Sequence, residues 1–397
     1  MGKRIALHIT RDAERQIRGG HPWLHANSIT KQSHEGKTGD LAVVFDQKRK
    51  FLAIGLYDPD SEIRCRVLQH HTPATINGEF FEAQFANAVQ KRAELPPNTT
   101  GYRLLNGEND GFPGLILDRY ADVLVVKLYT AAWVPFLPTL TAVFRGQFPD
   151  ASILLQTSRN MEASVSSEWL AGEPIAFPIT FVENGFTFEA DPLEGQKTGF
   201  FLDQRENRAR VETFSAGKRV LNVFAYTGGF SLYAARGGAT HVTSLDISQP
   251  ALDAAERNFL LNQDAPNVAA CNHTIVRGDA FDELARLANH KQTFDVVIID
   301  PPSFANKAAH VNNALGAYQK LATRGLRVLA PEGILVMASC SSRVSSEAFF
   351  NAIHEAANQM GYSLTEIERT GHALDHPITF REGAYLKCLF TKAIVKK

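Results

Sequence analysis

The sequence of 397 residues predicts an α/β protein whose C-terminal half forms a doubly wound sheet. Beyond residue 191, near-continuous apolar runs alternate with segments of helical periodicity, which is typical of a parallel sheet covered by helices on both faces. Residues 1–75 contain short β-rich runs separated by turn signals, and residues 76–190 mix strands with helices. We therefore expect three domains, spanning residues 1–75, 76–190 and 191–397.

Composition restricts the class of protein. Hydrophobic residues make up 44% and charged residues 21%, which excludes disordered and collagen-like chains. No apolar run reaches the roughly 18 residues that a membrane-spanning helix needs, and the N-terminus becomes charged too early for a secretory signal. The four cysteines show neither zinc-ligand spacing nor a disulfide framework. We therefore expect a cytoplasmic protein without a metal site.

The first expected domain is a small β-barrel. Its strand candidates are residues 41–46, 51–58 and 63–69. The preceding segment, 15–29, combines basic with aromatic residues, among them Arg18, His21 and Trp23. Such a combination can neutralise phosphates and stack on nucleic-acid bases, although Trp23 could equally fill a small core.

Charge is distributed unevenly along the chain. The whole sequence holds 41 Lys and Arg against 42 Asp and Glu, whereas residues 1–75 hold 12 against 8 and six of the 13 histidines. A basic first domain is suited to an anionic partner such as RNA. A difference of this size also arises by chance, and charge alone favours that explanation.

The middle segment is expected to be an α+β domain. A helix is predicted over residues 78–94, because Phe81, Phe85 and Val89 recur at helical spacing, and a breaker follows at 95–101. The further elements are strands at 102–106, 114–120, 123–129 and 152–158, a helix at 133–146, and a hairpin with an Asn-Gly turn at 178–191.

The C-terminal domain alternates strands and helices. Strand candidates are residues 219–226, 241–247, 273–279, 293–300, 333–340 and 363–369, and helix candidates are 228–237, 249–263, 280–289, 311–329 and 345–360. The last segment, 384–395, leaves no room for a following helix and is expected to return as an antiparallel strand. In such sheets, ligands bind beyond the carboxyl ends of the strands.

The first three strands each end in residues suited to a nucleoside. Gly228 and Gly229 allow close approach of a ligand after the first strand, but the third glycine of the dinucleotide fingerprint is missing. Asp246 could accept from ribose hydroxyls and Asp279 from an adenine amino group; each could instead cap the following helix. Their conjunction indicates an adenosine-containing ligand without a diphosphate, which S-adenosylmethionine fits.

The fourth and fifth strands end in residues suited to the substrate. The fourth ends in Asp300, Pro301, Pro302 and, two residues on, Phe304: the prolines stiffen the loop, and the aspartate and phenylalanine can face a planar base. The alternative is a rigid turn. The fifth strand ends at Cys340, where a thiol would lie beside the substrate. We interpret Cys65, Cys271 and Cys388 as small buried residues.

With these features the chain resembles the bacterial large-subunit ribosomal RNA 5-methylcytosine methyltransferases that carry an N-terminal PUA domain. The resemblance covers essentially the whole chain and rests on RGGHPWLHANSI (18–29), GENDGFPGLILDRY (107–120), QKTGFFLDQRENR (196–208), LNVFAYTGGFSLYAA (221–235), DPPSF (300–304) and ASCS (338–341). It implies a PUA domain, an α+β middle domain and a Rossmann-like methyltransferase domain. It also implies cofactor contacts from Phe201, Gln204 and Arg205, and suggests a homodimer.

Two positions depart from wider patterns. Ser303 stands where many RNA 5-methylcytosine enzymes carry a second cysteine, which is associated with product release. Its absence matches the family proposed here and leaves the releasing base unassigned. Asn222 stands where many methyltransferases carry an acid near the methionine moiety.

The sequence thus predicts an S-adenosylmethionine-dependent methyltransferase that acts on C5 of a cytosine in large-subunit ribosomal RNA. Cys340 is expected to form the covalent adduct, and Asp300 to hold the base. Expected cofactor contacts are Phe201, Gln204, Arg205, Asn222, Phe224, Ala225, Tyr226, Gly228, Asp246, Ile247, Ser248, Asp279, Ala280, Asp300 and Pro302; expected RNA contacts are Arg18, His21, Trp23, Pro301 and Phe304. The alternatives are methylation of a base nitrogen, for example on guanine, a nicotinamide dehydrogenase, and a non-catalytic RNA-binding protein.

Overall fold

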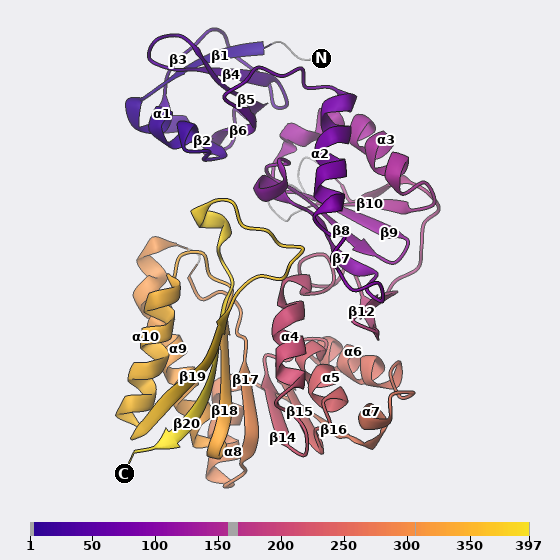
Figure 1. The fold of residues 1–397 in the computed structure, drawn as a ribbon, viewed down its shortest axis with the longest axis vertical. Coiled ribbons are helices and arrows are strands. Elements are labelled where there is room, and N and C mark those ends of the chain that lie inside the picture. Colours follow the sequence, from indigo (N-terminus) through magenta and orange to yellow (C-terminus); the bar gives the residue numbers. More distant parts are fainter. Residues whose placement is uncertain (1–3, 158–165, 306, 397) are drawn as a thin grey trace. The chain divides into compact units, whose positions relative to one another are not determined.

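The computed structural model describes residues 4–157, 166–305 and 307–396 (Figure 1). The chain divides into two compact units, which we describe separately. The first comprises Met1–Gly185, Ala190–Leu202 and Leu374–Gly383, and the second Phe186–Glu189, Asp203–Ala373 and Ala384–Lys397. The finer division into three domains stays a prediction.

The first unit begins with a mixed six-stranded sheet in the order β2-β6-β5-β4-β1-β3. Its elements are β1 (Arg4–Ile9), α1 (Arg11–Arg18), β2 (Trp23–His25), β3 (Ile29–Gln32), β4 (Leu41–Phe45), β5 (Phe51–Tyr57) and β6 (Ile63–His70). The three strands expected from the sequence are present, whereas β1, α1, β2 and β3 were not expected. Helix α1 is short and mostly charged; it forms because Thr10 caps its first turn and Ala13 and Ile17 are buried.

A second sheet, in the order β11-β10-β9-β8-β7, belongs to the same unit. Its elements and flanking helices are α2 (Gly78–Gln90), β7 (Gly101–Asn106), β8 (Leu115–Tyr120), β9 (Val123–Leu128), the 3-10 helix η3 (Ala131–Phe136), α3 (Leu137–Gln147), β10 (Ser152–Thr157) and β11 (Glu168–Ala171). Position 158 of the expected strand lies outside the described residues. Leu41, Ile54 and Leu56 of the first sheet share one buried core with Phe81 and Trp133. This shared core explains why the two sheets form one unit.

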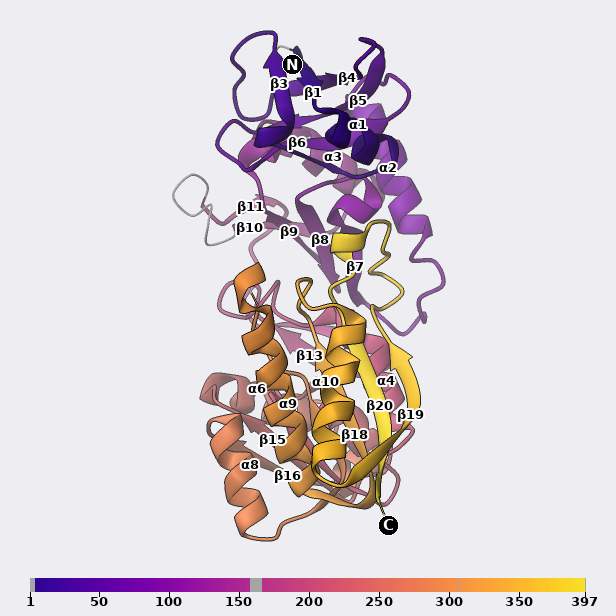
Figure 2. The same cartoon turned by 90° about the vertical axis from the view of Figure 1, so that its left-hand side faces the viewer.

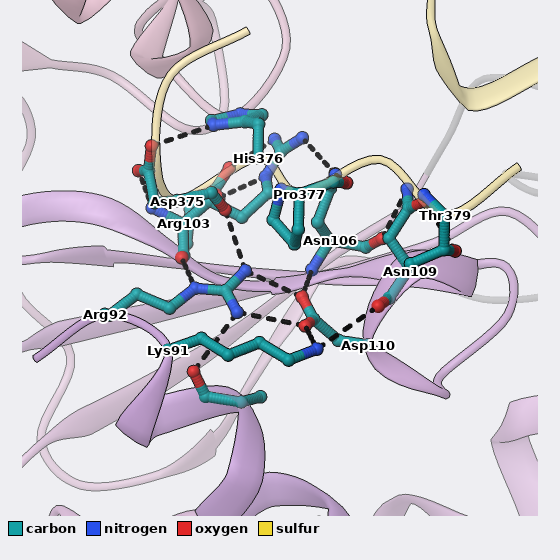
Figure 3. A network of polar contacts seen from close by, with 12 residues as sticks. Lys91, Arg92, Arg103, Asn106, Asn109, Asp110, Asp375, His376, Pro377 and Thr379 are labelled. Atoms are coloured by element: carbon teal, nitrogen blue, oxygen red, sulfur yellow. Dashed lines mark hydrogen bonds and ion pairs between the residues drawn. The ribbon is translucent and has the colours of Figure 1, made fainter.

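The segment Leu374–Gly383 is far from the rest of the first unit in sequence but is held in it by buried polar groups (Figure 3). Arg92 forms a two-pronged ion pair with Asp110, at 3.0 and 2.6 Å, and donates to the carbonyl of Asp375 at 2.7 Å. The Asp375 carboxylate in turn accepts from the Arg103 amide at 2.7 Å. This segment lies within the range 191–397 that we expected to form the C-terminal domain.

A hairpin follows the second sheet in the sequence. Strands β12 (Ile179–Glu183) and β13 (Phe186–Ala190) form a two-stranded sheet, as the Asn-Gly signal predicted. Asn184 and Gly185 have φ angles of 49° and 82°. Asparagine and glycine tolerate this left-handed backbone, which a tight hairpin turn requires.

The second unit is built on a seven-stranded sheet in the order β16-β15-β14-β17-β18-β20-β19. Its strands are β14 (Arg219–Val223), β15 (His241–Asp246), β16 (Asn272–Arg277), β17 (Phe294–Ile299), β18 (Leu329–Ser339), β19 (Tyr362–Thr370) and β20 (Lys387–Val395). Strand β20 runs antiparallel to both of its neighbours. The predicted fold class, an α/β chain with a doubly wound sheet and an antiparallel last strand, is confirmed.

Helices pack on this sheet in two groups. They are α4 (Arg205–Glu212), α5 (Gly229–Arg236), α6 (Gln249–Leu260), α7 (Pro266–Ala270), α8 (Ala280–Asn289), α9 (Val311–Arg327) and α10 (Ser346–Gln359). Figure 2 shows α8, α9 and α10 side by side, and their apolar residues share a core with Leu221 and Val223 of β14. The intervening Asn222 donates to Ser231 of α5 instead. This alternation along β14 shows that the two helix groups cover opposite faces.

Candidate active site at the strand ends of the second unit

The loop after β14 has an unusual backbone. Phe224, Tyr226 and Gly228 have φ angles of 62°, 48° and 78°, a left-handed region that side chains other than glycine rarely adopt. A Cβ atom on Gly228 would also lie 2.8 Å from the Cβ of Ala255 on α6. Non-glycine residues in this region cost about 1–3 kcal/mol each and cluster at ligand-binding sites. The carbonyl of Ala225 closes the turn by accepting from the Gly228 amide at 2.9 Å.

The Asp246 carboxylate stabilises this strained loop. Its Oδ2 accepts from the Tyr226 amide at 2.8 Å and its Oδ1 from the Ser248 amide at 2.9 Å. Ser248, and not Asp246, caps α6. The capping explanation for Asp246 is therefore wrong. Each oxygen retains capacity for another donor, and the neighbouring Ile247 side chain is 66% exposed, so a polar acceptor lies beside open apolar surface, which suits a nucleoside.

Asp279 has the role that we gave as its alternative. Its Oδ1 accepts from the amides of Phe281 and Asp282, at 2.8 and 3.3 Å, and so caps α8, which begins at the buried Ala280. Both bonds use the same oxygen, and the residue is exposed. A contact of Oδ2 with an adenine amino group stays a prediction.

A buried polar chain runs from the first strand to the third. Asn222 Nδ2 donates to Ser231, whose hydroxyl lies 2.7 Å from that of Ser244, and Ser244 lies 2.8 Å from His273 Nε2. Within the described part of the chain, Asn222 Oδ1 and Thr227 Oγ1 are buried without a hydrogen-bond partner. Buried polar atoms are nearly always satisfied, so these two atoms beside the loop are consistent with a bound polar ligand such as S-adenosylmethionine.

The three cofactor contacts implied by the resemblance are divided between the units. Gln204 is buried and donates to Asp300 Oδ2 at 2.8 Å, which joins the start of α4 to the end of β17. Arg205 is buried as well and pairs with Glu206 at 3.0 Å. Phe201 belongs to the first unit, where its ring lies 4.3 Å from the Lys197 ammonium.

The thiol of Cys340 lies beside the loop that follows β17. Its Sγ is 4.0 Å from the carbonyl oxygen of Pro301. Pro301 is buried, whereas Pro302 is exposed. The half-buried Phe304 packs its ring against Tyr318, with centroids 5.3 Å apart, so a stacking role toward a base stays a prediction.

The other cysteines differ from Cys340. Burial raises the pKa of Cys65 to about 12 and that of Cys271 to about 11, and raises that of Cys388 as well. These thiols are therefore unreactive near neutral pH. Cys65 and Cys388 are buried as expected, but Cys271 is half-buried, so our interpretation was wrong there: it precedes the edge strand β16, which neighbours cover on one side only.

Two residues near Cys340 were not predicted from the sequence. Tyr318 of α9 lies 2.8 Å from the hydroxyl of Ser339; burial raises its pKa to about 12, and the charges of Cys340 and Asp300 act in the same direction. Lys387 of β20 is buried, and burial lowers its pKa to about 8. A lysine within the apolar run of residues 384–390 was the available signal for it.

The residues expected to contact RNA lie in the first unit or at the DPPSF loop. Arg18 is bound by Glu14 and Asp46, the latter at 2.7 Å. Trp23 donates from its indole to Glu108 at 2.8 Å and packs against Phe380, with ring centroids 5.2 Å apart. These residues are therefore engaged within the unit, and their part in RNA binding stays a prediction.

Comparison with known proteins identifies the family. A family model for S-adenosylmethionine-dependent methyltransferases matches residues 141–391, and one for PUA-like domains matches residues 7–70. The ribosomal RNA large subunit methyltransferase of Deinococcus radiodurans is 48% identical over 98% of this chain and 97% of its own length. The chain belongs to this methyltransferase family.

Other members and solved structures agree. The ribosomal RNA large subunit methyltransferase I of Pseudoalteromonas translucida is 36% identical over 98% of this chain and 99% of its own. A structure from Streptococcus mutans, described as an S-adenosylmethionine-dependent methyltransferase, matches with a TM-score of 0.83 and 25% identity over 98% of this chain and 99% of its own. A methyltransferase complexed with SAH matches with a TM-score of 0.84, 25% identity and the same coverage.

Membrane and metal features can be assessed for the described residues. Within the ranges 4–157, 166–305 and 307–396, no helix combines the length and apolar character needed to cross a bilayer. The same ranges contain no cluster of three or more His, Cys, Asp or Glu side chains able to hold a metal ion.

Proposed function

We propose that this methyltransferase acts on C5 of a cytosine in large-subunit ribosomal RNA through a covalent adduct of Cys340. The observation that carries the proposal is the half-buried Cys340 thiol, 4.0 Å from the Pro301 carbonyl at the strand ends. Besides burial, the charges of Cys340 and Asp300 both raise the pKa of Tyr318, so the carboxylate and the thiol both lie near the Tyr318 hydroxyl. The names of the relatives support ribosomal RNA as the substrate class.

The chemistry explains why a cysteine is needed. C5 of cytosine is too electron-poor to attack a methyl group directly. The Cys340 thiolate adds to C6, the S–C6 bond forms, and the electron pair moves to C5, which then becomes nucleophilic. Bound S-adenosylmethionine supplies the electrophilic methyl group on its sulfonium. A base then removes the C5 proton, the S–C6 bond breaks, and Cys340 leaves as a thiolate.

The remaining strand-end residues are assigned by their free capacity. Asp246 retains acceptor capacity for ribose hydroxyls, and Asp279 retains Oδ2 for the adenine amino group. Asn222 Oδ1 and Thr227 Oγ1 can satisfy polar atoms of the amino-acid part. Asp300, held by Gln204, is assigned to the N3 and N4 edge of the cytosine.

A product assay with a matched cysteine control tests the proposal. Cys340→Ala should abolish formation of 5-methylcytosine in ribosomal RNA while binding of S-adenosylmethionine persists. The control Cys271→Ala, which removes the other half-buried thiol, should retain activity. RNA containing 5-fluorocytidine should become covalently attached to the unaltered protein, because fluorine cannot leave as a proton does.

The possible products discriminate between the candidate functions. Nucleoside mass spectrometry that finds N-methylguanine would favour base-nitrogen methylation and make Cys340 a bystander. A folded Cys340→Ala protein that forms 5-methylcytosine at a near-normal rate would contradict the covalent mechanism.

A further inference from the structure

Lys387 is a buried cation without a buried anion to match it. The residue is 2% exposed, and its Nζ donates to the carbonyl oxygens of Ser341, of Val344 at 2.6 Å and of Tyr385 at 3.2 Å. These three acceptors satisfy its three N–H donors but carry no net charge. Across the described parts of the chain, no carboxylate forms an ion pair with it. A buried ammonium of this kind is costly, and such groups are commonly functional.

The sheet register brings Lys387 to the nucleophile. On β20, Lys387 lies opposite Ser339, the last residue of β18, and Cys340 follows immediately. Two of the three carbonyls that Lys387 binds belong to the turn after Cys340, at Ser341 and Val344. The lysine therefore fixes the chain on the far side of the thiol, while the β18 ladder fixes it on the near side.

Lys387 is also coupled electrostatically to Cys340. Burial lowers the pKa of Lys387 to about 8, and the charge of Cys340 acts in the opposite direction. An attraction between two groups acts on both of them equally, so the ammonium favours the thiolate as the thiolate favours the ammonium. With a pKa of about 8, Lys387 is mostly protonated at neutral pH.

Other titratable groups surround the pair. Burial and the charge of Asp300, which directly follows β17, raise the pKa values of Tyr318 and Cys388, and a carboxylate there opposes a second negative charge nearby. Tyr318 of α9 stays protonated, because its pKa is raised to about 12. Cys388, beside Lys387 on β20, stays a thiol because burial raises its pKa. Arg343 lies on the turn but is exposed to solvent, which screens its charge.

We propose that Lys387 is a positioning residue for Cys340. The buried ammonium of Lys387 holds the 341–344 turn and favours the thiolate form of Cys340. The inference rests on the proposed function in that it takes Cys340 as the nucleophile. In the folded unit, the Lys387 ammonium offsets the repulsion between the Asp300 carboxylate and the Cys340 thiolate.

The test measures the thiol directly and uses no RNA. Iodoacetamide alkylates Cys340 when the thiolate sulfur displaces iodide, so the pH dependence of the rate gives the pKa of the thiol. The full-length protein is alkylated over a range of pH, and the modified Cys340 peptide is quantified by mass spectrometry. Lys387→Gln removes the charge but keeps amide donors, and Lys387→Met removes both. The matched control is Lys392→Gln, on the same strand but exposed and paired with Glu332.

The expected result separates charge from structure. The midpoint of Cys340 alkylation should lie below the roughly 8.5 of a free cysteine, and Lys387→Gln should raise it by about one unit, which slows alkylation at neutral pH about tenfold. Lys392→Gln should leave it unchanged. A midpoint in the unaltered protein at or above that of free cysteine would overturn the inference, even if no Lys387 variant folds. A Lys387→Gln midpoint equal to that of the unaltered protein would also overturn it. So would a midpoint that changes in Lys387→Met but not in Lys387→Gln, because the lysine would then act only through its hydrogen bonds to the turn.

The outcome is independent of the catalytic proposal. If Cys340→Ala retains 5-methylcytosine formation, the proposed function fails whatever the titration gives. If the alkylation midpoint ignores Lys387 while Cys340→Ala is inactive, only the inference about Lys387 fails.

Discussion

The two units each bury a cluster of charged and polar groups, and the clusters differ in how fully they are satisfied. In the first unit, Arg92 places all its donors on the carboxylate of Asp110 and on the carbonyls of Ala88, Arg103 and Asp375 (Figure 3). Burial alone would raise the pKa of Asp110, but the hydrogen bonds and charge of Arg92, with further hydrogen bonds from the Asn106 amide and Lys91, hold it below its ordinary value. This network is complete without any other molecule.

The strand ends of the second unit are incomplete by comparison. Asn222 Oδ1 and Thr227 Oγ1 are buried without a partner in the part of the chain that the structure describes, and Phe224 and Tyr226 hold a left-handed backbone. Lys387 is buried against carbonyls alone. The difference indicates that the first cluster stabilises the fold, whereas the second carries unsatisfied groups and backbone strain at a cost in stability.

The largest effect on stability is expected for Arg92→Met. Removing the guanidinium leaves the Asp110 carboxylate buried with the exposed Lys91 as its remaining cation, and breaking a buried pair in this way costs about 3–5 kcal/mol. Urea unfolding of the first unit should show the loss. The matched control is Lys91→Met, since the Lys91 side chain is 48% exposed and its pair with Asp110 should contribute no more than about 1 kcal/mol. Equal losses from both variants would remove the distinction between the clusters.

Acid should weaken the second unit through His273. Burial lowers the pKa of its ring to about 4, below the value of 6.5 in the unfolded chain. The unfolded chain therefore binds a proton first as the pH falls, so the contribution of the neutral ring is present above pH 6.5 and is lost between pH 6.5 and 4, to an extent of at most about 3 kcal/mol. His273→Gln cannot titrate and keeps a donor for Ser244, so its unfolding free energy should fall less steeply in this range. The same slope in both proteins would contradict the assignment.

Cofactor affinity should depend on the charge at Asp246. Asp246→Asn keeps one acceptor for the loop amides but removes the charge, and losing charge-assisted hydrogen bonds to the ribose should cost about 1.5–3 kcal/mol, or roughly ten- to a hundredfold in affinity. Calorimetry with S-adenosylmethionine measures this loss. Asp253→Asn, an exposed change on the neighbouring α6, serves as control. Unchanged affinity in folded Asp246→Asn would remove this residue from the site.

The smallest effect on stability is expected for Cys340→Ala. The thiol is half-buried and its contact with the Pro301 carbonyl is long, at 4.0 Å, so its removal should change the unfolding free energy by less than about 1 kcal/mol while abolishing methyl transfer. Thermal unfolding beside the activity assay tests both halves of the expectation. A loss comparable to that of Arg92→Met would mean that Cys340 belongs to the structural framework.

RNA binding by residues 1–75 is better tested by substitution than by deletion. Leu41, Ile54 and Leu56 of the first sheet are buried in the same core as Phe81, so removing residues 1–75 would expose apolar surface of the remaining unit. A deletion would therefore confound loss of RNA contacts with loss of folding.

The sequence alone determined the fold class and the strand-end constellation. Hydrophobic periodicity and composition locate the parallel strands. Parallel strands have their carboxyl ends at the same end of the sheet, which places Asp246, Asp279, Asp300 and Cys340 together there. The antiparallel last strand followed from the lack of room for a helix after residue 384. These features follow from local pattern and from general rules of sheet topology.

The tertiary structure decided what depends on distant partners. It set Asp246 against the amide of Tyr226, 20 positions earlier, and bound the segment Leu374–Gly383 to Arg92 and Asn109. It further set Lys387 opposite the end of β18. It also formed α1 from a mostly charged stretch by burying two apolar residues. No local pattern encodes such pairings, because a hydrogen bond or an ion pair depends on which side chains the folded chain brings together, and a single sequence records only their order.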